Sequence, residues 1–128
     1  MFDLYSFFNI PRDGRVYRVE RQTGLIEVDS WGWSSIGIRL SPSSGYVEKD
    51  SLFGWSIISK YRVNPNDGRI VIDNWLGNTD SGFRINKNSG ILEENNGWFG
   101  WSELNQRIDP ASGILQYRTS RSANWYSN

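Results

Sequence analysis

The sequence lacks cysteine and histidine entirely, and these absences remove several kinds of chemistry. Without cysteine the chain has no disulfide, no thiolate ligand for zinc and no thiol nucleophile. Without histidine it has no imidazole for acid–base catalysis or for most transition-metal sites. We therefore expect a protein that is not an enzyme and that uses no metal ion or cofactor.

An excess of charge of either sign is also missing. Lys and Arg together number 14, as do Asp and Glu, which gives a formal net charge of zero. A neutral protein lacks the overall attraction that drives nonspecific binding to nucleic acids or anionic membranes, so we expect at most a local patch for nucleic acid. Only three of the basic residues are Lys, a bias typical of guanidinium groups that pair with carboxylates or stack on rings.

Long hydrophobic runs are absent too. The most apolar stretch, Met1 to Ile10, is too short to span a bilayer and lacks both a basic start and a small-residue cleavage site. We therefore expect no membrane span, and a protein that is cytoplasmic or exported without a cleaved signal. A length of 128 residues fits a single domain over 1–128.

A short motif, R-[VIL]-x-x-x-[STD]-G, occurs five times. The glycines of successive copies are separated by 21, 23, 22 and 23 residues. The copies are Arg18 to Gly24, Arg39 to Gly45, Arg62 to Gly68, Arg84 to Gly90 and Arg107 to Gly113. A degenerate copy with Phe in place of Arg runs from Phe8 to Gly14. This spacing predicts tandem repeats of about 22 residues.

Each copy has the composition of a β-hairpin: an apolar strand, a turn rich in Asn, Asp, Ser and Pro, a Gly suited to positive φ, and a second strand. The second strands are predicted at Leu25 to Asp29, Tyr46 to Lys49, Arg69 to Asp73, Ile91 to Glu94 and Ile114 to Tyr117. The opposite connections are rich in Trp and Gly. The sequence therefore predicts an all-β domain of five antiparallel hairpins plus a degenerate N-terminal one.

Period-two alternation predicts which side chains share a face of these hairpins. The second residue after each turn Gly should join the apolar face, at Ile26, Val47, Ile70, Leu92 and Leu115. Each motif Arg should then lie opposite Glu27, Glu48, Val71, Glu93 and Gln116 in turn. Arg–Glu pairs on a solvated face can be simple cross-strand ion pairs. Alternatively, a row of such pairs beside Trp loops can bind polyhydroxylated ligands.

A meander of ten or eleven strands must hide its edges by closing, by packing on itself or by pairing with a partner. We favour a propeller-like form in which two hairpins make one blade, so that the chain supplies between two and three blades and a homo-oligomer closes the ring. The alternative is an up-and-down barrel within one chain. In that barrel a strand containing Phe2, Leu4, Phe7 and Phe8 would pair with the chain near Trp125 and Tyr126.

Seven Trp residues are present, and six lie at or near the same kind of loop. They can be core residues wedged between repeats, or a ring of aromatic platforms at one rim. The segment from Arg18 through Glu27, Trp31 and Trp33 resembles the blade motif of small fucose-binding β-propeller lectins. The resemblance implies ring closure by trimerisation and three sugar sites: Arg18, Glu27 and Trp31; Arg39, Glu48 and Trp55; and Arg84, Glu93 and Trp98.

Trp33 and Trp101, in the same loops, complete the set of candidate ligand-binding residues. We therefore expect a multivalent, lectin-like module for carbohydrate. The alternative is a structural, self-assembling or protein-recognition module in which the Trp loops are interfaces.

Overall fold

The computed structural model describes residues 2–74 and 76–127, and within these ranges it is all-β, as predicted. One antiparallel sheet contains ten strands in the order of the sequence, β1 to β10, and its ladder is not closed. Trp75, one of the predicted loop residues, lies outside the described ranges. The helices are α1 (Leu4–Phe7) and the 3-10 helix η1 (Gly97–Phe99). The strands are β1 (Tyr17–Val19), β2 (Leu25–Asp29), β3 (Trp33–Leu40), β4 (Tyr46–Ser51), β5 (Gly54–Val63), β6 (Arg69–Asn74), β7 (Gly77–Ile85), β8 (Ile91–Asn95), β9 (Trp101–Ile108) and β10 (Leu115–Tyr117).

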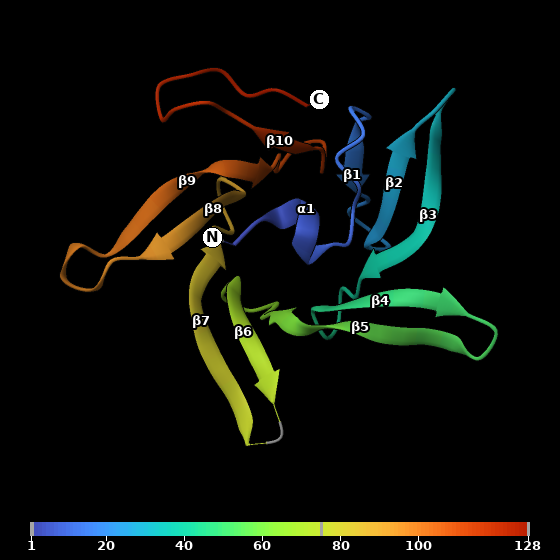
Figure 1. Ribbon diagram of the computed structural model, residues 1–128, viewed down its shortest axis with the longest axis horizontal. Helices are drawn as coiled ribbons and strands as arrows, with labels where there is room; N and C mark the ends of the chain where they lie inside the picture. Colours follow the sequence, from blue (N-terminus) through green and yellow to red (C-terminus); the bar gives the residue numbers. More distant parts are fainter. Residues whose placement is uncertain (1, 75, 128) are drawn as a thin grey trace.

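The strands form hairpins that radiate from the centre of the molecule (Figure 1). Two kinds of connection alternate. The turns that join β1 to β2, β3 to β4, β5 to β6, β7 to β8 and β9 to β10, here called inner turns, are the predicted motif turns. The connections between β2 and β3, β4 and β5, β6 and β7, and β8 and β9, here called hairpin tips, point outward.

The predicted register is confirmed in all five strand pairs that flank an inner turn. The Cα partners are Arg18↔Glu27, Arg39↔Glu48, Arg62↔Val71, Arg84↔Glu93 and Arg107↔Gln116. The predicted apolar residues of the second strands are also buried, each at most 1% exposed: Ile26, Val47, Ile70, Leu92 and Leu115. The alternation in sequence therefore identifies both the core face and the face that carries the arginines.

The inner turns are held by the same pair of backbone hydrogen bonds. Gly24 N–H donates to the oxygen of Glu20, and Gly24 O accepts from Leu40 N–H at the end of β3, both at 2.8 Å. Gly24 has a φ of +74°, and a Cβ there would lie 1.9 Å from Leu40 O. Glycine is therefore required twice over at this position, by backbone conformation and by close approach.

The two ends of the sheet contact each other through a short link rather than a ladder. An isolated antiparallel bridge joins Arg18 to Ile114, and Val19 N–H donates to Gly113 O at 2.8 Å. The alternative up-and-down barrel needs a closed ladder, which the sheet does not have. Residues 8–14, expected as a degenerate hairpin, contain no strand.

The prediction of an N-terminal strand, made for the alternative barrel, is wrong because residues Leu4–Phe7 form the helix α1. The Asp3 carboxylate caps this helix by accepting from Tyr5 N–H at 3.2 Å, a local preference that the apolar pattern concealed. The helix lies at the centre of Figure 1. Its apolar residues are buried and Phe8, just after it, is 0% exposed. This short segment therefore supplies the core around which the hairpins gather.

Side chains from the sheet fix the helix in place. Leu4 N–H donates to Gln106 Oε1 at 2.8 Å, and Gln106 Nε2 donates to Asp3 Oδ1 at 2.7 Å. Phe2 packs edge-on against Tyr61 and stacks on Phe83, with ring centroids 5.4 and 5.2 Å apart. The N-terminal segment is therefore joined to β5, β7 and β9.

Candidate functional site

An Arg, a Glu and a Trp from three neighbouring strands come together at three places on the sheet, here called the Arg–Glu–Trp sets. The Arg Nε donates to the Glu Oε1, and the guanidinium lies over the Trp ring. The first set is Arg18, Glu27 and Trp33, with a hydrogen bond of 2.8 Å and 4.2 Å from the guanidinium carbon to the ring centroid. The second is Arg39, Glu48 and Trp55, at 2.8 and 4.4 Å. The third is Arg84, Glu93 and Trp101, at 2.6 and 4.3 Å.

Strand register explains how each set assembles. In the first set Arg18 lies opposite Glu27, and Glu27 in turn lies opposite Ser35 on β3. Trp33 stands two residues before Ser35, so its side chain is on the same face as Glu27 and Arg18. The register of β2 and β3 shifts between Leu25 and Glu27, and corresponding shifts occur in the other long hairpins. The Trp of each set therefore lies between the register shift and the hairpin tip.

The Arg–Glu pairs are partly buried. The side chains of Arg18, Arg39 and Arg84 are 28%, 29% and 28% exposed, whereas those of Glu27, Glu48 and Glu93 are 16%, 14% and 8% exposed. The more buried carboxylate therefore orients and neutralises the guanidinium. The Arg side chain is the more exposed member of each pair. Among the described residues none accepts a hydrogen bond from the Nη atoms of these three arginines.

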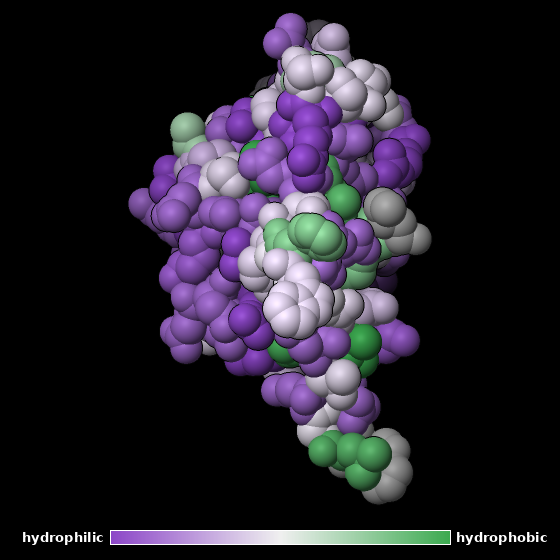
Figure 2. All heavy atoms as spheres, turned by 90° about the vertical axis from the view of Figure 1, so that its left-hand side faces the viewer, coloured by the Kyte–Doolittle hydropathy of each residue, from purple (hydrophilic) through white to green (hydrophobic). Residues whose placement is uncertain are grey.

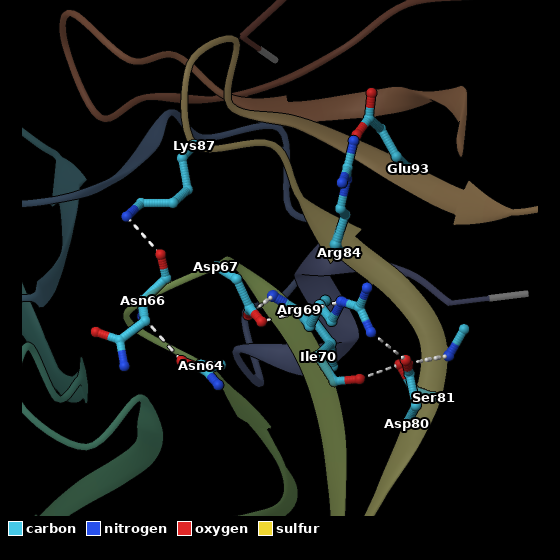
Figure 3. Close-up of polar contacts among 11 residues, drawn as sticks. Asn64, Asn66, Asp67, Arg69, Ile70, Asp80, Ser81, Arg84, Lys87 and Glu93 are labelled. Carbon is cyan, nitrogen blue, oxygen red and sulfur yellow. Dashed lines mark hydrogen bonds and ion pairs between the residues drawn. The ribbon is translucent and has the colours of Figure 1, made fainter. Parts of the chain in front are cut away.

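The third set has additional polar neighbours, and Figure 3 shows two of them, Arg69 and Asp80, near the Arg84–Glu93 pair. Asn86 Nδ2 donates to both carboxylate oxygens of Glu93, at 3.3 and 3.4 Å. Arg69, which pairs with Asp80 at 3.3 Å, lies 5.7 Å from the Trp101 ring. The Glu93 carboxylate is thus the most enclosed of the three, and the accessible donors of this set belong to arginine.

A hollow of about 710 Å³ lies beside the first set. Arg18 and Trp33 line it together with residues of the first and last inner turns, Glu20, Arg21, Gln22, Ala111, Ser112 and Ile114. Hydrogen bonds from the Thr23 side chain and backbone hold the pKa of Glu20 below its usual value. The hollow therefore offers a guanidinium, an ionised carboxylate and an indole ring to one small ligand.

Trp31 and Trp98, assigned to sites by the resemblance, are in neither of the sets that contain Arg18 and Arg84. Both are fully exposed at hairpin tips. Trp31 also adopts a φ of +62°, which is uncommon for a bulky residue. In the geometry of the structure Trp33 and Trp101 take the places that the resemblance gave to these two residues.

A fourth set was missed by sequence reasoning. Arg107 Nε donates to Gln116 Oε1 at 2.7 Å, and its guanidinium lies 4.7 Å from the ring of Trp125 in the C-terminal tail. Spacing is the signal that could have identified it, since the Trp follows the motif Arg by 15, 16, 17 and 18 residues in the four sets. Gln in place of Glu concealed the correspondence.

The remaining motif Arg is placed differently. Arg62 lies opposite Val71, and its Nε donates to the backbone oxygen of Ser44 at 2.6 Å. Its guanidinium lies 5.8 Å from the ring of Tyr46. This position therefore keeps the Arg without the carboxylate.

No protein-family model matches the chain, and no curated protein or solved structure matches it significantly. Within residues 2–74 and 76–127, no three acidic side chains are grouped so that they could hold a metal ion. In the same part of the chain no helix is both long and apolar enough to cross a membrane. The geometry of the sets is accordingly the basis for inferring function.

Proposed function

We propose that the protein is a non-enzymatic, multivalent carbohydrate-binding module whose sites are the three Arg–Glu–Trp sets. The observation that carries this proposal is the recurrence of one geometry at three places: an Arg bonded to a Glu, over a half-buried Trp ring. Guanidinium Nη groups donate to sugar hydroxyl oxygens, and an indole edge or face packs against sugar C–H groups.

The charge of the sets favours a neutral ligand. Each pairs one guanidinium with one carboxylate at 2.6 to 2.8 Å, so the site has no net charge to attract an anion. A single site of this kind binds weakly, because its groups remain partly solvated. Three sites on one rigid sheet gain affinity for a glycan surface through multivalency.

Under this proposal the hairpins are propeller-like repeats, and each repeat contributes to one kind of binding site. Support comes from the inner turns, where Leu40, Val63, Ile85 and Ile108 each donate a backbone hydrogen bond to the glycine of the preceding turn, and Val19 donates one to Gly113. The segment with Arg18, Glu27, Trp31 and Trp33 resembles the blade motif of small fucose-binding β-propeller lectins. Fucose and related neutral monosaccharides are therefore the first ligands to try.

The test is a glycan array probed with labelled protein, followed by competition with monosaccharides. The double variant Trp33→Ala with Trp55→Ala is expected to lose array binding while keeping the circular dichroism spectrum of the parent. The matched control, Trp31→Ala with Trp98→Ala, removes two indoles that contact no motif Arg and should keep glycan binding. Reproducible glycan binding that survives the first double variant and not the second would contradict the assignment.

The hairpin tips support a second candidate function, protein recognition or homo-oligomeric assembly. Apolar side chains at four tips are 78% to fully exposed: Trp31, Leu52, Phe53, Leu76, Trp98 and Phe99. Figure 2 shows apolar groups over the β8–β9 side and at a tip that projects from the body. Two of the tips expose two adjacent large apolar side chains each, Leu52 with Phe53 and Trp98 with Phe99, and exposed apolar patches are typical of interaction sites.

Solution mass across a concentration series tests this second function. Growth in mass that the tip variant Trp31→Ala with Trp98→Ala abolishes would assign the tips to assembly. A constant monomeric mass in the parent protein would leave homo-oligomerisation unsupported.

A further inference from the structure

The fourth set differs from the other three in charge. Gln116 stands where they have Glu, so the Arg107 guanidinium lies opposite a neutral amide. Gln116 orients Arg107 through the same Nε hydrogen bond, at 2.7 Å, without neutralising it. Among the described residues, none accepts a hydrogen bond from the Nη atoms of Arg107.

A second guanidinium adds to this difference. Arg118 lies 4.3 Å from the Trp125 ring, close to the 4.7 Å of Arg107, so two guanidinium groups contact one indole. The Arg118 side chain is only 6% exposed and is anchored by Glu103 at 3.2 Å and by the oxygen of Leu104 at 3.0 Å. It is therefore a fixed guanidinium at the edge of the set, paired with the more exposed carboxylate of Glu103.

The charges of the described residues leave this region positive. Arg121 reaches the backbone oxygen of Glu103 and brings a third guanidinium. The acidic neighbours are Glu103, which pairs with Arg118, and Asp109, which interacts with Arg107. Among the described residues three guanidinium groups therefore lie near two carboxylates. The region around the first set, with Arg18, Arg21, Glu20 and Glu27, is balanced.

We propose that the set formed by Arg107, Gln116 and Trp125, flanked by Arg118, is an anion-selective site that binds the carboxylate or sulfate group of an acidic glycan. Arginine Nη groups bind such oxyanions through paired hydrogen bonds, and the partly buried setting strengthens them. The glycan part rests on the proposed function of the other sets, whereas the anion preference follows from charge alone. One chain then offers neutral and acidic subsites on the same scaffold.

The test follows the indole N–H signals in NMR spectra during titration with inorganic sulfate, a probe that contains no sugar. We expect a saturable shift of the Trp125 signal and no comparable shift of Trp33. Gln116→Glu restores the carboxylate of the other sets and should weaken sulfate binding about tenfold or more. The reciprocal variant Glu27→Gln should create a sulfate response at Trp33. Both changes are nearly isosteric, so the fold is kept.

Equal responses at Trp33 and Trp125, or a Trp125 response that Gln116→Glu leaves unchanged, would overturn the anion site. The glycan array tests the sugar part of the proposal. The Gln116→Glu variant should lose binding to acidic glycans and keep binding to neutral ones. A sulfate response at Trp125 without any preference for acidic glycans would overturn the glycan part. Failure of the proposed function is seen separately: neutral glycans then do not bind on the array, while sulfate still shifts the Trp125 signal.

Discussion

The close packing of the inner turns gives a sharp prediction about stability. Gly45 has a φ of +79°, and a Cβ there would lie 1.7 Å from Val63 O and 2.7 Å from Val63 C. Gly14 has the same φ of +79° with nothing within 4 Å of the added Cβ. Gly45→Ala and Gly14→Ala therefore impose the same backbone conformation on Ala, and only the first also imposes a clash.

The expected losses follow from these two terms. Holding Ala in the left-handed region costs about 1 to 2 kcal/mol at either position. At Gly45 the neighbouring strand must also move away, which breaks the 3.0 Å hydrogen bond from Val63 N–H to Gly45 O. Leaving those buried groups unpaired costs about 1 to 3 kcal/mol more, in addition to the lost packing. We therefore expect a loss of about 1 to 2 kcal/mol for Gly14→Ala and about 3 to 5 kcal/mol for Gly45→Ala.

Urea unfolding, followed by Trp fluorescence and circular dichroism, measures both free energies of unfolding. The slope of the free energy against urea should be unchanged if both variants keep the native fold. Equal losses in the two variants would refute the close approach of Gly45 to Val63.

Further predictions concern the core and one tyrosine. Phe8→Ala should lower the free energy of unfolding by about 3 to 5 kcal/mol, measured by urea unfolding, because the ring is 0% exposed at the centre of the hairpins. A loss below about 1 kcal/mol would show that the N-terminal segment does not support the core. Burial, followed by the hydrogen bond to Asp13, raises the pKa of Tyr17 from 10.0 to about 12. The unfolded chain releases this proton first, so the Tyr17 contribution to stability is complete below about pH 10 and is lost as the pH rises to about 12. The tyrosinate absorbance of Tyr17→Phe, subtracted from that of the parent, should show this late titration; a difference centred near pH 10 would contradict it.

Much of the fold could be read from the sequence because local rules determine it. The inner turns have a fixed motif length, so alternation alone gives the pairing of Arg18 with Glu27 and the burial of Ile26. The start and end of β2, Leu25–Asp29, were also predicted correctly. These features depend only on residues that flank one inner turn.

The features that were missed depend on contacts between distant parts of the chain. The N-terminal segment looked like a strand, yet its helix is stabilised by Gln106, more than a hundred residues away in sequence. The Trp of each set could not be chosen from the loop composition, because composition does not distinguish Trp31, at the hairpin tip with a φ of +62°, from Trp33, the first residue of β3. The register shift between Leu25 and Glu27, which no turn motif announces, accompanies the placement of Trp33.

Arg62 separates the structural role of the motif Arg from its proposed binding role. Its Nε donates to the Ser44 backbone oxygen at 2.6 Å, and neither a carboxylate opposite it nor an indole over it completes a set. Arg62→Gln should therefore lower stability by about 1 to 3 kcal/mol and leave glycan binding unchanged. Arg39→Gln should lower stability comparably and also weaken binding, because the guanidinium between Glu48 and Trp55 is lost. If Arg39→Gln binds glycans as the parent does, the Arg–Glu–Trp sets are cross-strand supports of the sheet, and the ligand-binding surface lies elsewhere.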